Sequence, residues 1–204
     1  HFWELTSSQI GYMNLPYFLS ALIALGVAPW ISTKLGKKRG GMLTLAISFG
    51  MAPMPYILRL LGWFPENGTD ALFWTLVVFN ALEVTLIIIA ASLVAAMIAD
   101  IVEDSEVKTG RRSEGIFFAA NSFAQKAVNG LGVVVAGQIL AIIQFPTQAK
   151  PGEVPESTIA DLAIYYIPVI FFFYILALAV LSLYKINRAG HEANLRQLAD
   201  SQRP

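Results

Sequence analysis

One apolar stretch of the chain carries a lysine near its middle. Lys126 lies about halfway along residues 115–143, which are otherwise mostly apolar. Its helical face also carries Ser122, Gln125 and Asn129. At 100° per residue, these four side chains fall within an arc of about 100° and form one polar stripe. Because a charge at that depth in a membrane helix is costly, such residues commonly line a substrate or ion pathway. The pattern predicts a site for a hydroxyl-rich ligand, or a wet cavity.

A second ionisable residue lies at a similar depth in the preceding apolar stretch. Glu83 is near the middle of residues 71–99, and adjacent antiparallel helices would allow it to form an ion pair with Lys126. Asn80 lies one turn from Glu83 and could extend the polar surface, or it could hydrogen-bond between helices. The alternative is that the two charges only stabilise the bundle. Buried ion pairs are poor stabilisers, because desolvation cancels most of the attraction.

The composition is that of a membrane protein. Of the 204 residues, 56% are hydrophobic and 14% charged, and the mean hydropathy is +0.60, which is too apolar for an ordinary soluble domain. A net charge of +0 and a longest basic run of three residues give no indication of nucleic-acid binding. Without cysteine, and with His1 and His191 standing alone in the sequence, no metal site is predicted in this chain. An integral-membrane enzyme is also disfavoured, because Glu83 is the single central carboxylate.

Five stretches are long and apolar enough to cross a membrane as helices. We therefore predict an all-α polytopic bundle over residues 1–184, followed by a polar tail, 185–204. The stretches are residues 10–31, 41–63, 71–99, 115–143 and 159–184. Three glycines in the fourth, Gly130, Gly132 and Gly137, favour close approach of a neighbouring helix. Nothing at the N-terminal end reads as a signal peptide, and we expect the chain to begin inside a longer one.

Lysine and arginine are distributed unequally between the two ends of the expected helices. Most of the 14 lie in the connections 32–40 and 100–114 and in the tail from 185, whereas the opposite connections contain Arg59 and Lys150. Because cytoplasmic loops are enriched in Lys and Arg, the basic connections and the C-terminus are expected in the cytoplasm.

The connection between the third and fourth helices carries a specific motif. Residues 99–115 follow the pattern A-D-x-x-E-x-x-E-x-K-T-G-x-R-x-E-G, and Lys126 lies eleven residues further on. This combination resembles the glycoside-pentoside-hexuronide:cation symporters, the relatives of melibiose permease in the major facilitator superfamily. The resemblance implies helices eight to twelve of a twelve-helix transporter. The six-helix N-terminal half and helix seven would then lie outside this chain.

The resemblance also implies roles for particular residues. The helix bearing Lys126 is expected to line the central cavity, near the sugar and the coupling cation. Asn121, Ser122, Gln125 and Lys126 match positions that face substrate in the family. The cation, Na⁺ or H⁺, would bind carboxylates of the missing N-terminal half, and no other cofactor is expected. A charge cluster on the loop would lock the cytoplasmic side closed in one state: Asp100, Glu103, Arg111, Arg112 and Glu114. The alternative is a solvated loop in which Ser113 caps the fourth helix.

The function expected from these features is cation-coupled symport of a sugar or glycoside by alternating access, with membrane lipid and the missing half as partners. The expected location is the inner membrane of a bacterium. Transport of a lipid or lysolipid is the alternative within the same branch of the superfamily. It is suggested by Ala91, which stands where the family has an indole that stacks on sugar, and by the long apolar helix faces.

Overall fold

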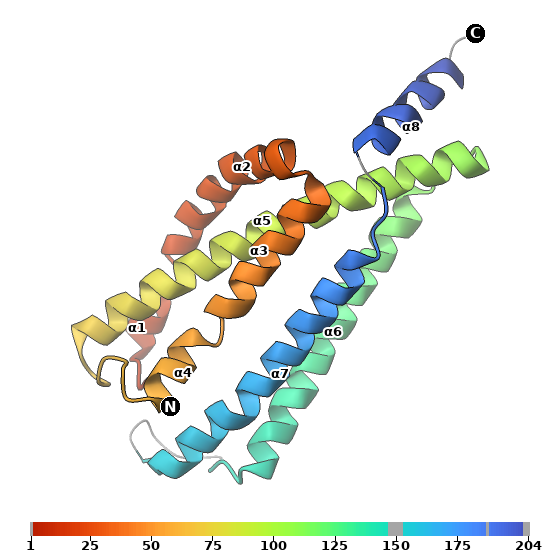
Figure 1. Ribbon diagram of the computed structural model, residues 1–204. Helices are drawn as coiled ribbons and strands as arrows, with labels where there is room; N and C mark the ends of the chain where they lie inside the picture. Colours follow the sequence, from red (N-terminus) through yellow and green to blue (C-terminus); the bar gives the residue numbers. More distant parts are fainter. Residues whose placement is uncertain (1, 147–152, 187, 202–204) are drawn as a thin grey trace.

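The computed structural model describes residues 2–146, 153–186 and 188–201, and these residues form helices without any strand (Figure 1). The predicted all-α fold is confirmed. Parts of the expected connection 144–158 and of the tail, with Lys150 and Arg203, lie outside the described residues. The helices are α1 (Ser7–Tyr12), α2 (Pro16–Leu35), α3 (Lys37–Met51), α4 (Met54–Leu60), α5 (Asp70–Thr109), α6 (Glu114–Ile142), α7 (Glu156–Ser182) and α8 (Arg188–Ser201).

Five of the helical segments have the length and hydropathy of membrane spans, as predicted. They are Ser7–Leu35, Lys37–Leu60, Asp70–Thr109, Glu114–Ile142 and Glu156–Ser182. Prolines divide the first two, because proline lacks the backbone donor that a helix interior needs but is accepted in the first turn. Pro16 begins α2, and Pro53 precedes α4, which carries Pro55 in its first turn.

Helix α5 is longer than the sequence pattern indicated. We expected the third helix to end at residue 99, but α5 continues to Thr109, so this boundary was wrong. Hydropathy falls after Asp100, yet the helical apolar face continues through Val102, which is 2% exposed. Lys108 pairs with Asp104 one turn earlier, at 2.6 Å. The helix ends where Gly110 adopts a left-handed conformation, with φ of 67°, which glycine tolerates without a Cβ clash.

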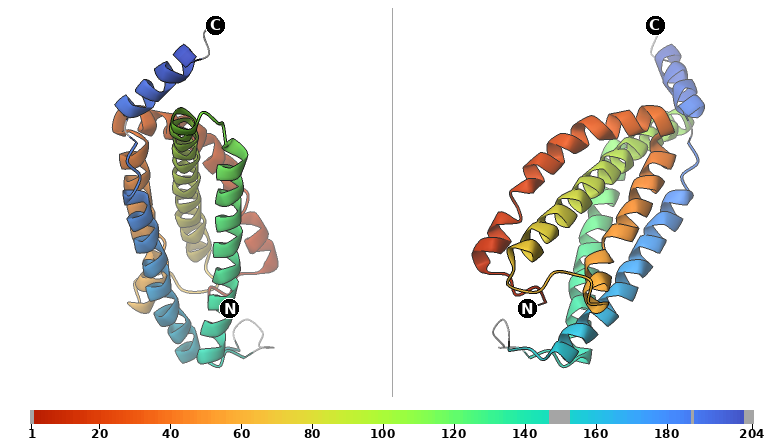
Figure 2. Two further views of the ribbon diagram at one scale, coloured as in Figure 1. Left: turned by 90° about the vertical axis from the view of Figure 1, so that its right-hand side faces the viewer. Right: turned by 60° about the vertical axis from the view of Figure 1, so that its left-hand side comes forward.

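The best-packed part of the bundle consists of α2, α3 and α5, with α7 against the outer face of α3 (Figures 1 and 2). Ala24 and Ala28 of α2 lie against Ile89 and Leu93 of α5 in one apolar cluster. Gly40 brings α3 close to α2, since a Cβ there would lie 2.4 Å from Cγ2 of Ile31. These small residues let the helices approach closely, as is usual in membrane bundles.

Helix α6 stands apart from this packed group. The left view of Figure 2 shows it separated from α5 and α7 over most of its length. Of its residues, Ile139 alone is buried. A Cβ at Gly130, Gly132 or Gly137 would meet no atom within 4 Å among the described residues, so no helix of this chain makes the close approach that these glycines favour.

Candidate functional site

The predicted polar stripe lies on the most open helix of the structure. The neighbouring Asn121 is half-buried, whereas all four side chains of the stripe are exposed on α6: Ser122, Gln125, Lys126 and Asn129. Asn129 also borders an apolar groove of about 450 Å³ that reaches Phe173 of α7. The side chains of the stripe are therefore available to a ligand or to another part of a larger protein.

Helix α5 supplies the other polar residues predicted at mid-depth. Glu83 is half-buried and lies within electrostatic reach of Tyr56, Tyr166 and Tyr174. Asn80 is half-buried as well, and its Oδ1 is fully buried without a hydrogen-bond partner in the described part of the chain. Glu83 therefore lies on the side of α5 that faces α4 and α7.

Glu83 and Lys126 both lie within the described residues 2–146, and they do not form an ion pair with each other. The pairing considered from the sequence assumed that consecutive helices pack closely along their whole length. Instead, α6 leaves α5 after the short connection at Gly110–Ser113 and carries Lys126 away from the packed group (Figure 2).

A network centred on Asp100 joins three elements at the end of the bundle that carries α8. The Asp100 side chain is only 4% exposed, and its Oδ1 accepts from Nζ of Lys37 at 2.5 Å, from the first turn of α3. Its Oδ2 accepts from the hydroxyl of Tyr184 at 2.6 Å, just beyond α7. Burial of Tyr184, together with this hydrogen bond, raises the pKa of its hydroxyl above the usual value. The network ties α3 and the end of α7 to α5.

The second group of charges lies further along α5 and around the connection to α6. Arg112 pairs with Glu114 at 3.2 Å and with Glu106 at 3.6 Å. Arg111 is exposed and forms no ion pair within the described residues. Ser113 occupies the N-cap position of α6, but its side chain makes no capping hydrogen bond. Of the five residues predicted as one gating cluster, Arg112 and Glu114 belong to this second group, Asp100 belongs to the first network, and Arg111 pairs with neither among the residues described.

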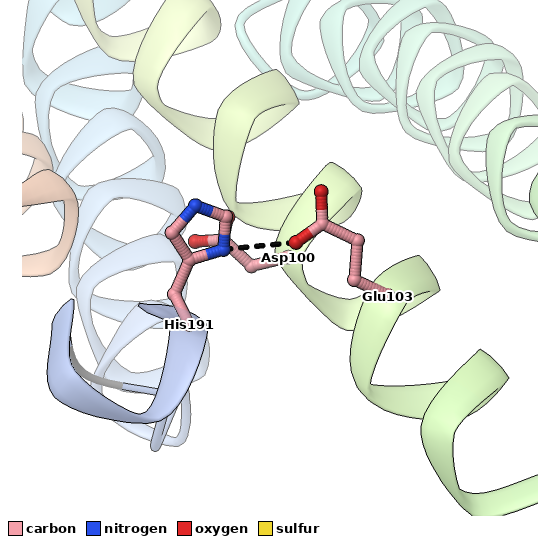
Figure 3. A group of neighbouring side chains, drawn as sticks. All are labelled: Asp100, Glu103 and His191. Carbon is pink, nitrogen blue, oxygen red and sulfur yellow. Dashed lines mark ion pairs between the residues drawn. The ribbon is translucent and has the colours of Figure 1, made fainter. Parts of the chain in front are cut away.

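Helix α8 contacts the Asp100 network through His191. His191 approaches two carboxylates of α5, with Nδ1 at 2.9 Å from Oε2 of Glu103 and at 3.2 Å from Oδ1 of Asp100 (Figure 3). One turn further along, Nδ2 of Asn194 donates to Oδ1 of Asp104 at 3.3 Å. His191, which has no other histidine or cysteine near it in the sequence, thus lies beside two carboxylates of α5 in the structure.

Sequence reasoning missed the partners of Asp100: Lys37, Tyr184 and His191. Lys37 was counted among the basic residues of the connection 32–40, and Tyr184 as the last residue of a helix. The usable signal was that all of these residues lie at the same predicted end of the bundle as Asp100. A cavity of about 810 Å³ adjoins the network, between the α2–α3 junction and α8, and its wall includes Lys37, Lys38, Arg39, Asp100, Lys185 and His191.

Comparison with known proteins identifies the family. Residues 1–188 match the family described as MFS/sugar transport protein. The chain belongs to this family. This confirms the resemblance to the sugar symporters of the major facilitator superfamily, and it places the chain among transport proteins rather than integral-membrane enzymes.

Three relatives have names that describe transport. The chain is 28% identical to "Uncharacterized symporter sll1374" of Synechocystis sp. over 202 residues, which are 95% of this chain and 34% of that protein. It is 32% identical to "Putative glycoside/cation symporter YagG" of Escherichia coli K12 over 102 residues, 50% of this chain and 22% of the relative. It is 30% identical to "Isoprimeverose transporter" of Lactiplantibacillus pentosus over 124 residues, which are 60% of this chain and 24% of that protein. The chain thus spans about a third or less of each relative. No solved structure matches it.

Proposed function

We propose that this chain forms part of a cation-coupled symporter for a sugar or glycoside that works by alternating access. The observation that carries the proposal is the family match over residues 1–188. The names of the relatives from Escherichia coli and Lactiplantibacillus pentosus support a glycoside or sugar as the cargo.

The stripe on α6 supplies the chemistry of the cargo site. Amide, hydroxyl and ammonium groups of Asn121, Ser122, Gln125 and Lys126 offer donors and acceptors to sugar hydroxyls. Because Ser122, Gln125 and Lys126 are exposed, they are free to line a cavity against the remainder of the transporter. Transporters of this kind bind cargo near the middle of the membrane, between two halves of the protein.

The coupling cation, Na⁺ or H⁺, binds mainly outside this chain in our proposal. Glu83 is the one carboxylate at mid-depth in the described helices, and an alkali cation requires several oxygen ligands. The remainder of the transporter is therefore the main partner of this chain. Lys126 either balances the charge of the cation site or binds cargo directly.

The Asp100 network is the gate on one side of the membrane in this proposal. We place it in the cytoplasm of a bacterial cell, together with α8, because the basic residues gather at this end of the bundle. Lys34, Lys37, Lys108 and Arg112 all lie there, whereas Arg59 lies at the opposite end. Opening this side for release of cargo would require the contacts of Asp100 with Lys37 and Tyr184 to rearrange.

The experiment is uptake of a panel of labelled glycosides into vesicles that contain the full-length transporter, with and without a Na⁺ or H⁺ gradient. Gradient-driven uptake of at least one glycoside is expected, with a loss of tenfold or more in Lys126→Ala. Lys34→Ala is the matched control, since it removes an exposed lysine outside the stripe and outside the loop motif, and it should transport like the wild type. Equal uptake by Lys126→Ala would make Lys126 structural. Lysolipid uptake without any glycoside uptake would replace the sugar proposal with the lipid alternative.

A further inference from the structure

We propose that Asp100, Glu103 and His191 form a binding site for one divalent transition-metal ion of the Zn²⁺ type, which would fasten α8 to α5. The site lies at the α8 end of the bundle, away from the polar stripe. It shares Asp100 with the proposed gate, but its test measures metal binding and does not depend on transport. Figure 3 shows the two carboxylates on α5 and the imidazole on α8 directed toward one another.

The spacing of the three ligand atoms suits a metal. Nδ1 of His191 is 2.9 Å from Oε2 of Glu103 and 3.2 Å from Oδ1 of Asp100, and one ligand atom from each residue lies within 4.8 Å of the others. Two ligands bound to Zn²⁺ at about 2.1 Å are about 3.0 Å apart at a right angle and about 3.4 Å apart at the tetrahedral angle. The two distances from Nδ1 of His191 already fall close to this range, whereas the oxygens of Asp100 and Glu103, up to 4.8 Å apart, would have to approach by up to about 1.4 Å, which rotation of the Glu103 side chain can supply.

Two of these atoms lack a hydrogen bond. Oε2 of Glu103 and Nδ1 of His191 are both buried, and neither has a hydrogen-bond partner in the described part of the chain, although they are neighbours. Leaving a buried polar atom unsatisfied costs free energy. A cation between them would give both atoms a partner. The Tyr184 hydroxyl, bonded to the other oxygen of Asp100, would hold that carboxylate in position.

Lys37 is the competitor for this site. Its ammonium occupies the same Oδ1 of Asp100 at 2.5 Å, and it also lies 3.5 Å from the carbonyl of Ala96. Lys37 borders the cavity of about 810 Å³, which gives its side chain room to move when a metal binds. The carboxylates of Asp100 and Glu103 carry two formal negative charges against the one positive charge of Lys37, so these three groups together favour a cation.

The set of donors selects the kind of metal. One imidazole nitrogen and two carboxylate oxygens are ligands that Zn²⁺ and neighbouring first-row ions accept, with water in a remaining position. Ca²⁺ and Mg²⁺ prefer oxygen ligands alone. The adjoining cavity, which Asp100 and His191 both border, would admit the water.

The test is titration of Zn²⁺ into the untagged full-length protein in detergent after treatment with a chelator, followed by calorimetry, with Co²⁺ absorption as a second readout. We expect one saturable site per chain and weaker binding, by tenfold or more, in both His191→Ala and Glu103→Gln. Lys37→Gln should bind Zn²⁺ more tightly, because it frees Asp100, whereas a purely structural cluster would show no such gain. Asn194→Ala is the matched control. It removes the neighbouring contact between α8 and α5 but no ligand, and it should bind like the wild type.

A variant that folds poorly could lose Zn²⁺ binding for that reason alone, so the unfolding temperature of each variant is measured with and without Zn²⁺. Zn²⁺ should raise the unfolding temperature of the wild type and of Asn194→Ala, but not that of His191→Ala. The absence of saturable binding by the wild type would overturn the proposal, and so would binding that His191→Ala and Glu103→Gln both leave unchanged.

Discussion

Lys37 and Asp100, 63 positions apart in the sequence, meet at 2.5 Å and join the beginning of α3 to α5. The two side chains are buried to different degrees, at 27% and 4% exposed. This difference makes the effects of removing one partner or the other unequal.

Lys37→Met should destabilise the protein more than Asp100→Asn. The first change leaves a carboxylate buried without its closest cation, whereas the second leaves an ammonium that can turn toward the adjoining cavity. Loss of one partner of a fully buried pair costs about 3–5 kcal/mol, and the partial exposure of Lys37 should reduce this to about 2–3 kcal/mol. Chemical unfolding in detergent measures both variants. The reverse order would mean that Tyr184 and His191 compensate Asp100 without Lys37.

Gly40→Ala should destabilise the contact between α2 and α3. The new methyl group would lie 2.4 Å from Cγ2 of Ile31, so the helices must separate. Overpacking of this kind costs about 1–3 kcal/mol. Gly50→Ala in the same helix is the control, since a Cβ there meets nothing within 4 Å of the described atoms, and it should be neutral or slightly stabilising. Equal free energies of unfolding for Gly40→Ala and Gly50→Ala would contradict the close approach of Gly40 to Ile31.

Glu83→Gln and Lys126→Ala should have additive effects on thermal stability. The two residues make no ion pair here, and additivity within about 0.5 kcal/mol is usual for sites that are not in contact. The measurement is a double-mutant cycle on the purified full-length protein. A coupling energy well above 0.5 kcal/mol would show that the two charges interact in the assembled transporter.

Tyr174→Phe should lower stability through Ser48. The hydroxyls of Tyr174 and Ser48 lie 2.8 Å apart and join α7 to α3, and Ser48 is only 1% exposed. Leaving a buried hydroxyl without its partner costs about 1–3 kcal/mol. Tyr165→Phe, at a side chain that is 45% exposed, supplies the comparison and should change stability by less than about 0.5 kcal/mol. Equal unfolding midpoints for the two variants would show that Ser48 finds another acceptor or donor.

The five spans were predictable from the sequence, because hydropathy and length determine which segments enter a membrane. The breaks at Pro16 and Pro53 were predictable only in part, because Pro29 and Pro168 lie inside α2 and α7 without ending these helices. The end of α5 was not. The charges after Asp100 mark the end of the apolar stretch, but a helix can continue outside the membrane, and the glycine at 110 was the better signal.

The site was predictable in part. The stripe on α6 depends on helical periodicity alone, and the structure places its side chains on that helix as expected. The partners of Asp100 depend on how α3, α7 and α8 pack against α5, which periodicity does not contain. The absence of an ion pair between Glu83 and Lys126 has the same cause. The direction in which α6 leaves α5 is a tertiary property, and helical periodicity does not determine it.

Helix α5 has a mechanical consequence for a transporter. Its 40 residues are one continuous helix from Asp70 to Thr109, about 60 Å long at 1.5 Å per residue. That is twice the thickness of the hydrocarbon core, about 30 Å. If such a helix tilts about its centre in the membrane, its two ends move in opposite directions. A tilt of about 10° at the centre swings each end, roughly 30 Å away, by about 5 Å. Asp100, about 16 Å from the centre, would move by about 3 Å, whereas Ile89 lies at the centre of the helix and would stay almost in place. The contacts of Asp100 with α3 and α8 would therefore change while Ile89 keeps its packing against Ala24.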